Sequence, residues 1–351
     1  MLRIRTTSQR WAAVCGVLVL VTVLFAGHCE SGKGILIQNI YVTQGLNGDD
    51  SGNVEVYPLT ATGNVAPATT IAGASTDIVD AHKSAFDASG NLYVTSKNNS
   101  SVLVFAAGAS GDVAPISTIS GSNTLLARPT GIAIDSTGKI YVADYGTEDP
   151  GNPSVFVFAA GANGNVAPVA TITGAATGLV FPNGLALDSA GKIYVANEGT
   201  GEVTGGSVTV YAAGATGNAA PVATIIGSAT LLNYPHGLTL DAAGNIYVAS
   251  EPIGVGAPDG EAGPGPSGSV VVFAAGATGN VAPKTTITGS STLLTGPNGI
   301  SLDVLGNIYV ADNSANAVLV FAAGASGNVA PISNISGANT GFSDLHGVTV
   351  H

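Results

Sequence analysis

Three of the five histidines in this 351-residue chain stand at the same position of a repeated motif. They are His82, His236 and His346, and the other three copies carry Thr130, Asn183 and Asn298 there. Imidazole nitrogens and amide oxygens bind divalent cations, so copies arranged around one axis would bring such ligands together. The column therefore predicts an axial site for calcium or zinc, formed by His82, Asn183, His236, Asn298 and His346. The alternative is that small polar residues cap the turn before a strand.

A second column, two residues earlier in each copy, is chemically mixed. It contains Asp80, Arg128, Phe181, Tyr234, Gly296 and Asp344. Aromatic rings beside carboxylates can stack on a sugar and accept hydrogen bonds from its hydroxyl groups. We therefore predict that Asp80, Arg128, Phe181, Tyr234 and Asp344 bind a ligand. Alternatively, the two aromatic residues only cover strand ends.

These columns belong to a unit of about fifty residues that occurs six times, a length typical of propeller blades. The motif G-I-A-I-D-S-T-G-K-I-Y-V-A-D at 131–144 recurs at 184–197, 237–250 and 299–312, with degenerate copies from Lys83 and near Gln38. Alternating apolar and small polar residues, separated by glycine-rich breaks, predict four strands per copy. The predicted fold is therefore all-β: a six-bladed β-propeller of four-stranded antiparallel blades.

The two ends of the chain are expected to close this ring. Residues 347–351 match the first strand of a copy, whereas the copy near Gln38 begins at its second strand. The N- and C-terminal strands would then pair in one blade and remove an open sheet edge. The repeated aspartate of I-D-x-x-G is predicted to accept hydrogen bonds in a tight turn on the opposite face.

Only one connection in the repeat varies in length. From the tyrosine of I-Y-V to the aromatic residue that ends the following Val-rich run there are 12 residues at Tyr93 and Tyr309, 16 at Tyr41, 17 at Tyr141 and Tyr194, and 26 at Tyr247. This connection and the one that precedes the histidine column emerge on the same side of a blade, which we call the top face. Loops on a rigid scaffold commonly carry binding residues, although these loops could also serve solubility alone.

Acidic residues outnumber basic ones on the predicted top face. The expected cations there are Lys83, Lys97 and Arg128. The expected acids are Asp49, Asp50, Asp77, Asp80, Asp144, Glu148, Asp149, Glu198, Glu202, Glu251, Asp259, Glu261, Asp312 and Asp344. The formal net charge of the chain is −12, which argues against a nucleic-acid partner.

Residues 1–28 differ in composition from the rest of the chain. Arg3, Arg5 and Arg10 precede the apolar run 11–27, the layout of a signal peptide or an N-terminal membrane anchor. We expect the propeller, residues 29–351, to be extracytoplasmic: secreted, periplasmic or at the cell surface. The alternatives are an uncleaved N-terminal membrane anchor and a lipid anchor at Cys29. Because Cys15 lies in the apolar run, no internal disulfide is expected in the propeller.

The sequence P-N-G-L-A-L-D-S-A-G-K-I-Y-V-A-N at 182–197 and its copies resemble the NHL repeat and the six-bladed SMP-30/gluconolactonase propellers. The resemblance implies a divalent cation at the axis, bound by an Asn of P-N-G, an Asp of P-D-G and a Glu from an early strand. Asn183 and Asn298 match the Asn position. No copy has Asp before the glycine, and no counterpart of the Glu is evident. His82, His236 and His346 also resemble, loosely, the axial histidines of peptidylglycine and streptogramin lyases.

We therefore expect an exported NHL-like binding or interaction protein that engages a small polar molecule, a sugar or a protein on its acidic top face and axial ring. Contact with a membrane is expected only through the N-terminal segment. A metal-dependent lactonase-like hydrolase or lyase with an axial divalent cation is the alternative. A purely structural or adhesive surface protein is a third reading, favoured by the regularity of the copies.

Overall fold

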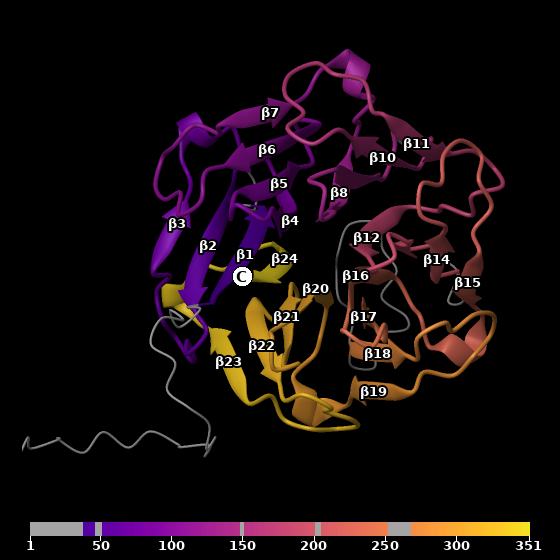
Figure 1. Ribbon diagram of the computed structural model, residues 1–351. Helices are drawn as coiled ribbons and strands as arrows, with labels where there is room; N and C mark the ends of the chain where they lie inside the picture. The colour runs from indigo at the N-terminus through magenta and orange to yellow at the C-terminus, as the bar shows by residue number, and fades with distance from the viewer. Residues whose placement is uncertain (1–37, 46–50, 148–150, 201–204, 252–267) are drawn as a thin grey trace, which may run out of the picture. The chain divides into compact units, whose positions relative to one another are not determined.

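The computed structural model of the protein describes residues 38–45, 51–147, 151–200, 205–251 and 268–351. These residues form six four-stranded antiparallel sheets, arranged as the blades of a propeller around one axis (Figure 1). The predicted all-β, six-bladed fold is confirmed. Outside the described residues lie the predicted leader, 1–28, and the acids Asp49, Asp50, Glu148, Asp149, Glu202, Asp259 and Glu261.

We number the blades 1 to 6 around the ring and call their strands a to d from the axis outward. Strands a are β24 (Leu345–Val350), β4 (Ala81–Phe86), β8 (Pro129–Ile134), β12 (Pro182–Leu187), β16 (Pro235–Leu240) and β20 (Pro297–Leu302). Strands b are β1 (Asn39–Gly45), β5 (Leu92–Ser96), β9 (Ile140–Asp144), β13 (Ile193–Asn197), β17 (Ile246–Ser250) and β21 (Ile308–Asp312). Strands c are β2 (Gly52–Pro58), β6 (Ser101–Phe105), β10 (Ser154–Phe158), β14 (Ser207–Tyr211), β18 (Ser269–Phe273) and β22 (Ala317–Phe321).

Strands d are shorter and lie at the rim: β3 (Thr69–Ile71), β7 (Ser117–Ile119), β11 (Ala170–Thr173), β15 (Ala223–Ile226), β19 (Thr285–Thr288) and β23 (Ser333–Ser336). Short 3₁₀ turns follow five of them: η1 (Ala74–Thr76), η2 (Ser122–Thr124), η3 (Ser228–Thr230), η4 (Ser290–Thr292) and η5 (Ala338–Thr340). Within the described ranges, no helix is long and apolar enough to cross a membrane.

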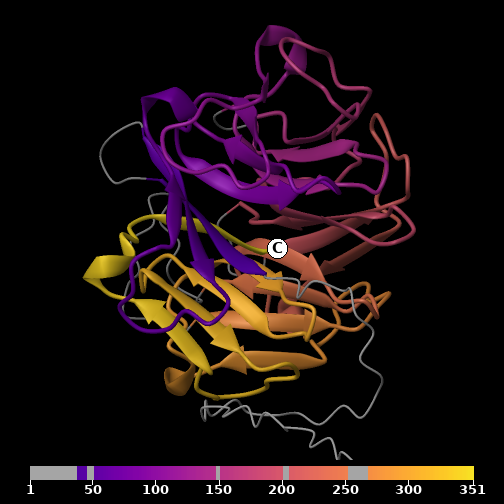
Figure 2. The ribbon, with the colours of Figure 1, turned by 60° about the vertical axis from the view of Figure 1, so that its left-hand side comes forward.

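The two ends of the chain complete blade 1, as predicted. Its strand order is β24-β1-β2-β3, and Ile40 of β1 pairs with Val350 of β24. The backbone N–H of Asn39 donates to the carbonyl of His351 at 2.6 Å, and the N–H of His351 donates back at 3.0 Å. The C-terminus therefore lies beside the first strand (Figures 1 and 2). This pairing covers the edge of β1 that would otherwise be open.

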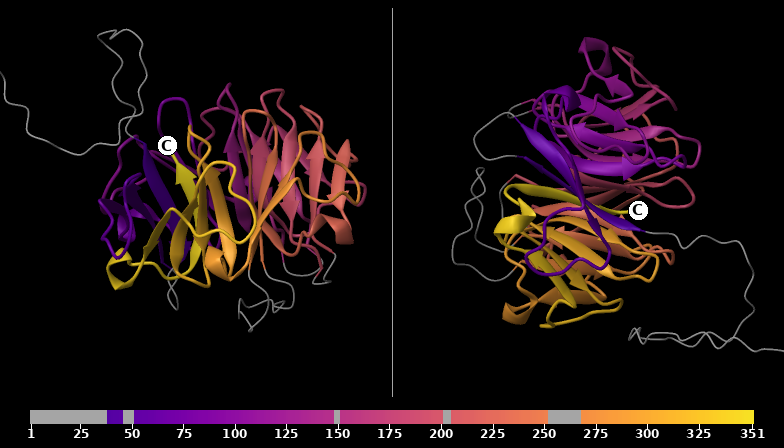
Figure 3. Two further views of the ribbon diagram at one scale, coloured as in Figure 1. Left: turned by 90° about the horizontal axis from the view of Figure 1, so that it is seen from below. Right: turned by 90° about the vertical axis from the view of Figure 1, so that its left-hand side faces the viewer.

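Buried apolar residues fill the space between neighbouring blades, so the core is a ring of six similar clusters. The strands run along the axis in the side view (Figure 3), so each strand a begins at the top face and ends at the other. The Asp135 turn lies at that other end: its Oδ1 accepts from the N–H groups of Thr137 and Lys139, at 2.8 and 3.0 Å. Asp87, Asp188, Asp241 and Asp303 make the same turn, which confirms the predicted role.

Candidate functional site

The residues of the histidine column are the second residues of strands a, and these strands line the axis. Their side chains therefore converge at the top of the axis. His82 and Asn183 are buried, whereas the side chains of His236 and His346 are 13% and 12% exposed. The column is thus brought together, but its contacts divide into separate groups around His346, His236 and Lys83.

His346 lies between two carboxylates. Its Nε2 is 3.1 Å from Oδ1 of Asp80 and 3.3 Å from Oδ2 of Asp344. Burial alone would lower the pKa of His346, but the hydrogen bonds to Asp344 and Asp80 outweigh it and raise the pKa. In the same way, His346 lowers the pKa of both aspartates against the effect of their burial. This group favours an imidazolium held by two carboxylates.

His82 stacks on His346, with ring centroids 4.7 Å apart and planes inclined by 16°. Burial, reinforced by the positive charge of His346, holds the pKa of His82 well below its usual range. Its Nδ1 is buried and has no hydrogen-bond partner among the described residues. His82 is therefore a neutral imidazole, and its unsatisfied nitrogen suits a water molecule or a ligand atom.

His236 also lies between two carboxylates, on the other side of the ring. Its Nε2 is 3.2 Å from Oε1 of Glu251, and its Nδ1 is 3.7 Å from Oε1 of Glu198. The amide Nδ2 of Asn183 is 3.3 Å from the same Nδ1 and donates to Glu198 at 2.5 Å. Burial alone would raise the pKa of Glu251, but His236 lowers it and favours the ionised carboxylate.

An aromatic wall adjoins this second group. The hydroxyl of Tyr145 donates to Oε2 of Glu198 at 2.5 Å, and its ring stacks on Phe181 at a centroid distance of 4.7 Å. The guanidinium of Arg128 lies 5.2 Å from the centre of the Tyr145 ring. This arrangement offers an apolar surface beside charged groups, which is what binding of a sugar ring requires.

The mixed column is joined by backbone hydrogen bonds to a second mixed column, which is the residue after strand b in blades 2 to 6 and the last residue of β1 in blade 1. The N–H of Tyr145, for example, donates to the carbonyl of Arg128 at 3.0 Å. The other pairs are Lys97 with Asp80, Glu198 with Phe181, Glu251 with Tyr234, Asn313 with Gly296, and Gly45 with Asp344. These bonds fix twelve backbone positions around the top of the axis and place their chemically varied side chains on one rim.

Three members of the mixed column have left-handed backbone conformations without being glycine. The φ angles of Asp80, Phe181 and Tyr234 are 56°, 52° and 42°. Such conformations cost of order 1 to 3 kcal/mol each and occur often at binding sites. Here the backbone bond to the residue after strand b compensates for that cost and holds the side chains at the top of the axis.

Two charged features near the axis were not predicted. Glu198 and Glu251, expected only among the acids of the top face, directly follow strands b and contact His236. The sequence feature that could have located them is their shared position directly after strand b, before the connection of variable length. Lys83, expected on the top face, is instead 8% exposed inside the axial channel. The other five blades have glycine at the position equivalent to Lys83, which leaves room in the channel for this long side chain.

Asp144 and Asp312 are also not surface acids of the top face. Both are fully buried at the ends of strands b. Asp144 accepts from the N–H of Ala127 at 2.9 Å, and Asp312 accepts from the N–H of Thr295 at 2.7 Å. Burial raises the pKa of both carboxyl groups. Their role is to satisfy backbone donors of the connection that leads to strand a.

The residues expected to hold a divalent cation do not form a cradle for it. Oδ1 of Asn298 accepts a hydrogen bond from the ammonium of Lys83 at 2.5 Å. His236 and His346 are each engaged with carboxylates, and His82 stacks on His346. Among the described residues, no group of three or more His, Cys, Asp or Glu is arranged to hold a metal ion. Within the part of the chain that the structure describes, three atoms of these residues are buried without a hydrogen-bond partner: Oδ1 of Asn183 and Nδ1 of His82 and of His346.

Solved structures with the same fold include proteins of several kinds. A putative 6-phosphogluconolactonase from Bacteroides fragilis is 13% identical, with a TM-score of 0.53 over 90% of this chain and 98% of that one. A periplasmic gluconolactonase from Pseudomonas aeruginosa is 15% identical, with a TM-score of 0.52 over 88% and 98%. A protein of unknown function from Bacteroides caccae is 9% identical, with a TM-score of 0.56 over 90% and 98%. At these identities the likeness supports the fold alone.

Comparison of the sequence with protein families is more specific. None of the curated proteins matches the sequence. The NHL repeat matches residues 294–321. The family described as SMP-30/gluconolactonase/LRE-like region matches residues 59–261, which is more than half of the chain. Together with the six-bladed fold, this match shows that the chain belongs to the SMP-30/gluconolactonase/LRE-like family.

Proposed function

We propose that this lactonase-like propeller binds a small polyhydroxylated molecule of the sugar-lactone class at the top of its axis and hydrolyses it. The observation that carries the proposal is His236 between Glu251 and Glu198, at 3.2 and 3.7 Å. The two carboxylates orient this imidazole for proton exchange with a bound molecule. The family match supports the lactone as the substrate class.

Recognition of the ligand would use the polar and aromatic groups around His236. The carboxylates of Glu198 and Glu251 accept hydrogen bonds from hydroxyl groups, and the Tyr145–Phe181 pair offers a stacking surface. Glu251 is the more accessible of the two acids, with 26% of its side chain exposed against 12% for Glu198. We therefore assign contact with the reacting water to Glu251 and orientation of His236 to Glu198.

The reaction is addition of water to the lactone carbonyl. A water molecule held by Glu251 bonds through its oxygen to the carbonyl carbon and gives a proton to the Glu251–His236 pair. The ring C–O bond then breaks, and the same proton goes to the leaving ring oxygen, which yields the hydroxy acid. No oxidant, reductant or second substrate is needed. Positioned acid–base groups of this kind contribute about 100- to 10,000-fold to a rate.

A panel of sugar lactones, followed by NMR for conversion to the hydroxy acids, tests the proposal. The wild-type protein is expected to hydrolyse at least one lactone, and His236→Asn is expected to lower that rate at least about 100-fold. Asp77→Asn is the matched control, because it also removes a polar group of the top face, but from an exposed position outside the site. Equal rates for the wild type and His236→Asn would overturn the proposal.

Binding without turnover is a second candidate function. It is favoured by the engagement of both nitrogens of His236: Glu251 lies at Nε2, and Asn183 lies 3.3 Å from Nδ1. In that case a sugar lactone and its open acid would both raise the melting temperature, and His236→Asn would abolish the effect. Stabilisation by ligand with no product in the NMR assay would select this function over hydrolysis.

A further inference from the structure

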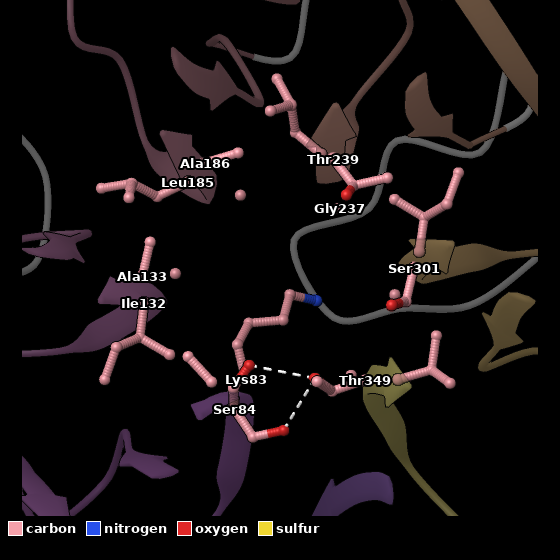
Figure 4. Close-up of a pocket in the computed structure, with 18 of the residues that line it drawn as sticks. Lys83, Ser84, Ile132, Ala133, Leu185, Ala186, Gly237, Thr239, Ser301 and Thr349 are labelled. Atoms are coloured by element: carbon pink, nitrogen blue, oxygen red, sulfur yellow. Dashed lines mark hydrogen bonds between the residues drawn. The ribbon is translucent and has the colours of Figure 1, made fainter. Parts of the chain in front are cut away.

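The third residue of strand a is glycine in five of the six blades and lysine in the sixth. The residues are Lys83, Gly131, Gly184, Gly237, Gly299 and Gly347. Strands a approach so closely that a Cβ on Gly237 would lie 2.5 Å from the carbonyl oxygen of Asn298, and one on Gly299 would lie 2.7 Å from the N–H of Val348. The channel is therefore bare of side chains in this layer, except for Lys83 (Figure 4).

The side chain of Lys83 crosses this layer and ends among oxygen acceptors of blades 6 and 1. Its Nζ donates to Oδ1 of Asn298 at 2.5 Å, to the carbonyl of His346, and more weakly to the carbonyl of Asn298 at 3.4 Å. An ammonium group has three donors and no acceptor, so these three oxygens satisfy it. They are also neutral oxygens of the kind that would otherwise bind a calcium ion.

Lys83 also separates the polar top of the axis from a cavity of about 370 Å³ on the other side of the glycine layer. That cavity is lined by the later residues of strands a, among them Ser84, Ser301 and Thr349. Figure 4 shows the lysine side chain extending across its middle. A cation at the top of the axis would therefore meet the positive charge of Lys83 directly below it.

We propose that the ammonium group of Lys83 is the resident cation of the axis and replaces the divalent metal implied by the family. The ammonium donates to Oδ1 of Asn298, one of the two residues at the family's Asn position, so this oxygen is not free to bind a metal ion. Its positive charge also repels a second cation. The inference does not depend on the proposed hydrolysis, because it is tested by cation binding and stability. With glycine at position 83, as in the other five blades, the same acceptors would become free for an added cation.

The test measures the metal content and melting temperature of the purified chain at pH 6. This pH lies far below the ordinary pKa of a lysine side chain, so the ammonium form is the one tested. We expect no stoichiometric divalent ion, and no change in melting temperature with a chelator or with added calcium or zinc. A tightly bound ion whose removal lowers the melting temperature would overturn the inference.

Two variants sharpen the test. Lys83→Gly is expected to melt lower than the wild type and to recover by at least about 2 °C with added butylammonium or calcium chloride, because both supply a cation to the vacated acceptors. Lys284→Ala is the control and should not respond. It replaces an exposed lysine by alanine, the residue that blade 1 has at the equivalent position, Ala68. If Lys83→Gly does not fold, Lys83→Met keeps the apolar stem and should respond to calcium instead. A folded variant that responds no more than Lys284→Ala would contradict the inference.

Discussion

Two imidazoles at the top of the axis are each held between two carboxylates, and this arrangement defines the chemistry of the site. His346 contacts Asp80 and Asp344, and His236 contacts Glu198 and Glu251. The surroundings differ, however. His346 also stacks on the buried His82, whereas His236 adjoins the aromatic wall of Tyr145 and Phe181. The His236 group is therefore the one suited to meet a ligand, and the His346 group the one suited to hold the site together.

A different buried acid, Glu55 in strand c of blade 1, links the closing blade to the connection before β24. The hydroxyl of Tyr57 lies 2.7 Å from both Oε2 of Glu55 and the carbonyl of Thr340. A phenol has one proton to donate, so both short bonds can form only if the carboxyl group carries a proton. Burial raises the pKa of Glu55 to about 7, partly offset by its hydrogen bonds with Tyr57 and Gln44. Glu55 is therefore protonated at mildly acidic pH.

Glu55→Gln should accordingly stabilise the protein at pH 8 and leave it unchanged at pH 4. The folded state binds more protons than the unfolded state between the ordinary pKa of 4.5 and about 7, so wild-type stability falls as the pH rises through that window. Glutamine mimics the protonated form, so the variant does not lose stability in this window. At pH 8 its free energy of unfolding should exceed that of the wild type by roughly 1 to 3 kcal/mol. Urea unfolding at the two pH values measures it. The same dependence on pH in both proteins would refute the assignment.

Residue roles were only partly predictable from the sequence. The histidine column and the mixed column could be found, because each stands at a constant distance from the glycine-rich motif. Glu198 and Glu251 lie directly before connections of variable length, where copies no longer align, so their contact with His236 could not be predicted. The packing of strands a that buries Lys83 depends on the distance between blades, and no single copy of the repeat contains that information.

At the scale of elements, a short side-chain cap joins each blade to the one before it. Oδ1 of Asn328, in the c-to-d connection of blade 6, accepts from the N–H of Ser291 in η4 at 2.7 Å. Asn64, Asn165, Asn218 and Asn280 make the same bond, and Asp112 replaces asparagine in blade 2. The repeated G-N-x-A-P segment is therefore explained as a cap between blades, which the sequence pattern alone did not reveal.

Asn328→Ala should lower stability by about 0.5 to 1 kcal/mol, the usual effect of removing an exposed cap. Asn328→Asp should be close to the wild type, because Asp112 performs the same role in blade 2 at 2.6 Å. The midpoints of urea unfolding at neutral pH distinguish the two variants. Equal losses in both would show that the asparagine contributes through something other than its acceptor oxygen.

At the scale of the whole molecule, the ring depends on pairing between the two ends of the chain. Removal of residues 347–351 deletes the pairs from Thr43↔Gly347 to Ile40↔Val350 and exposes the edge of β1. We expect the melting temperature to fall by more than about 5 °C, because a loss of several hydrogen bonds and buried side chains costs a few kcal/mol. His351→Ala keeps the backbone pairing and serves as the control. A truncated protein that melts like the wild type would contradict closure.

The fold of the whole molecule was the most predictable level, because six copies of one pattern specify six equivalent blades. The alternation of residues in I-Y-V and the constant turn aspartates located strands a and b within a few residues of β8 and β9. What could not be predicted is how the symmetry is broken. One lysine among five glycines, and two glutamates after strands b, distinguish this axis from a regular ring.

The most direct test of the proposed site is the hydrolysis of one responsive sugar lactone by the wild type, Glu251→Gln and Asp77→Asn, measured by NMR at pH 7. If Glu251 holds the attacking water beside His236, Glu251→Gln should lose at least about 100-fold in kcat while the lactone still raises its melting temperature. Asp77→Asn should match the wild type. A rate for Glu251→Gln equal to that of Asp77→Asn would contradict the assignment of the reaction to the top of the axis.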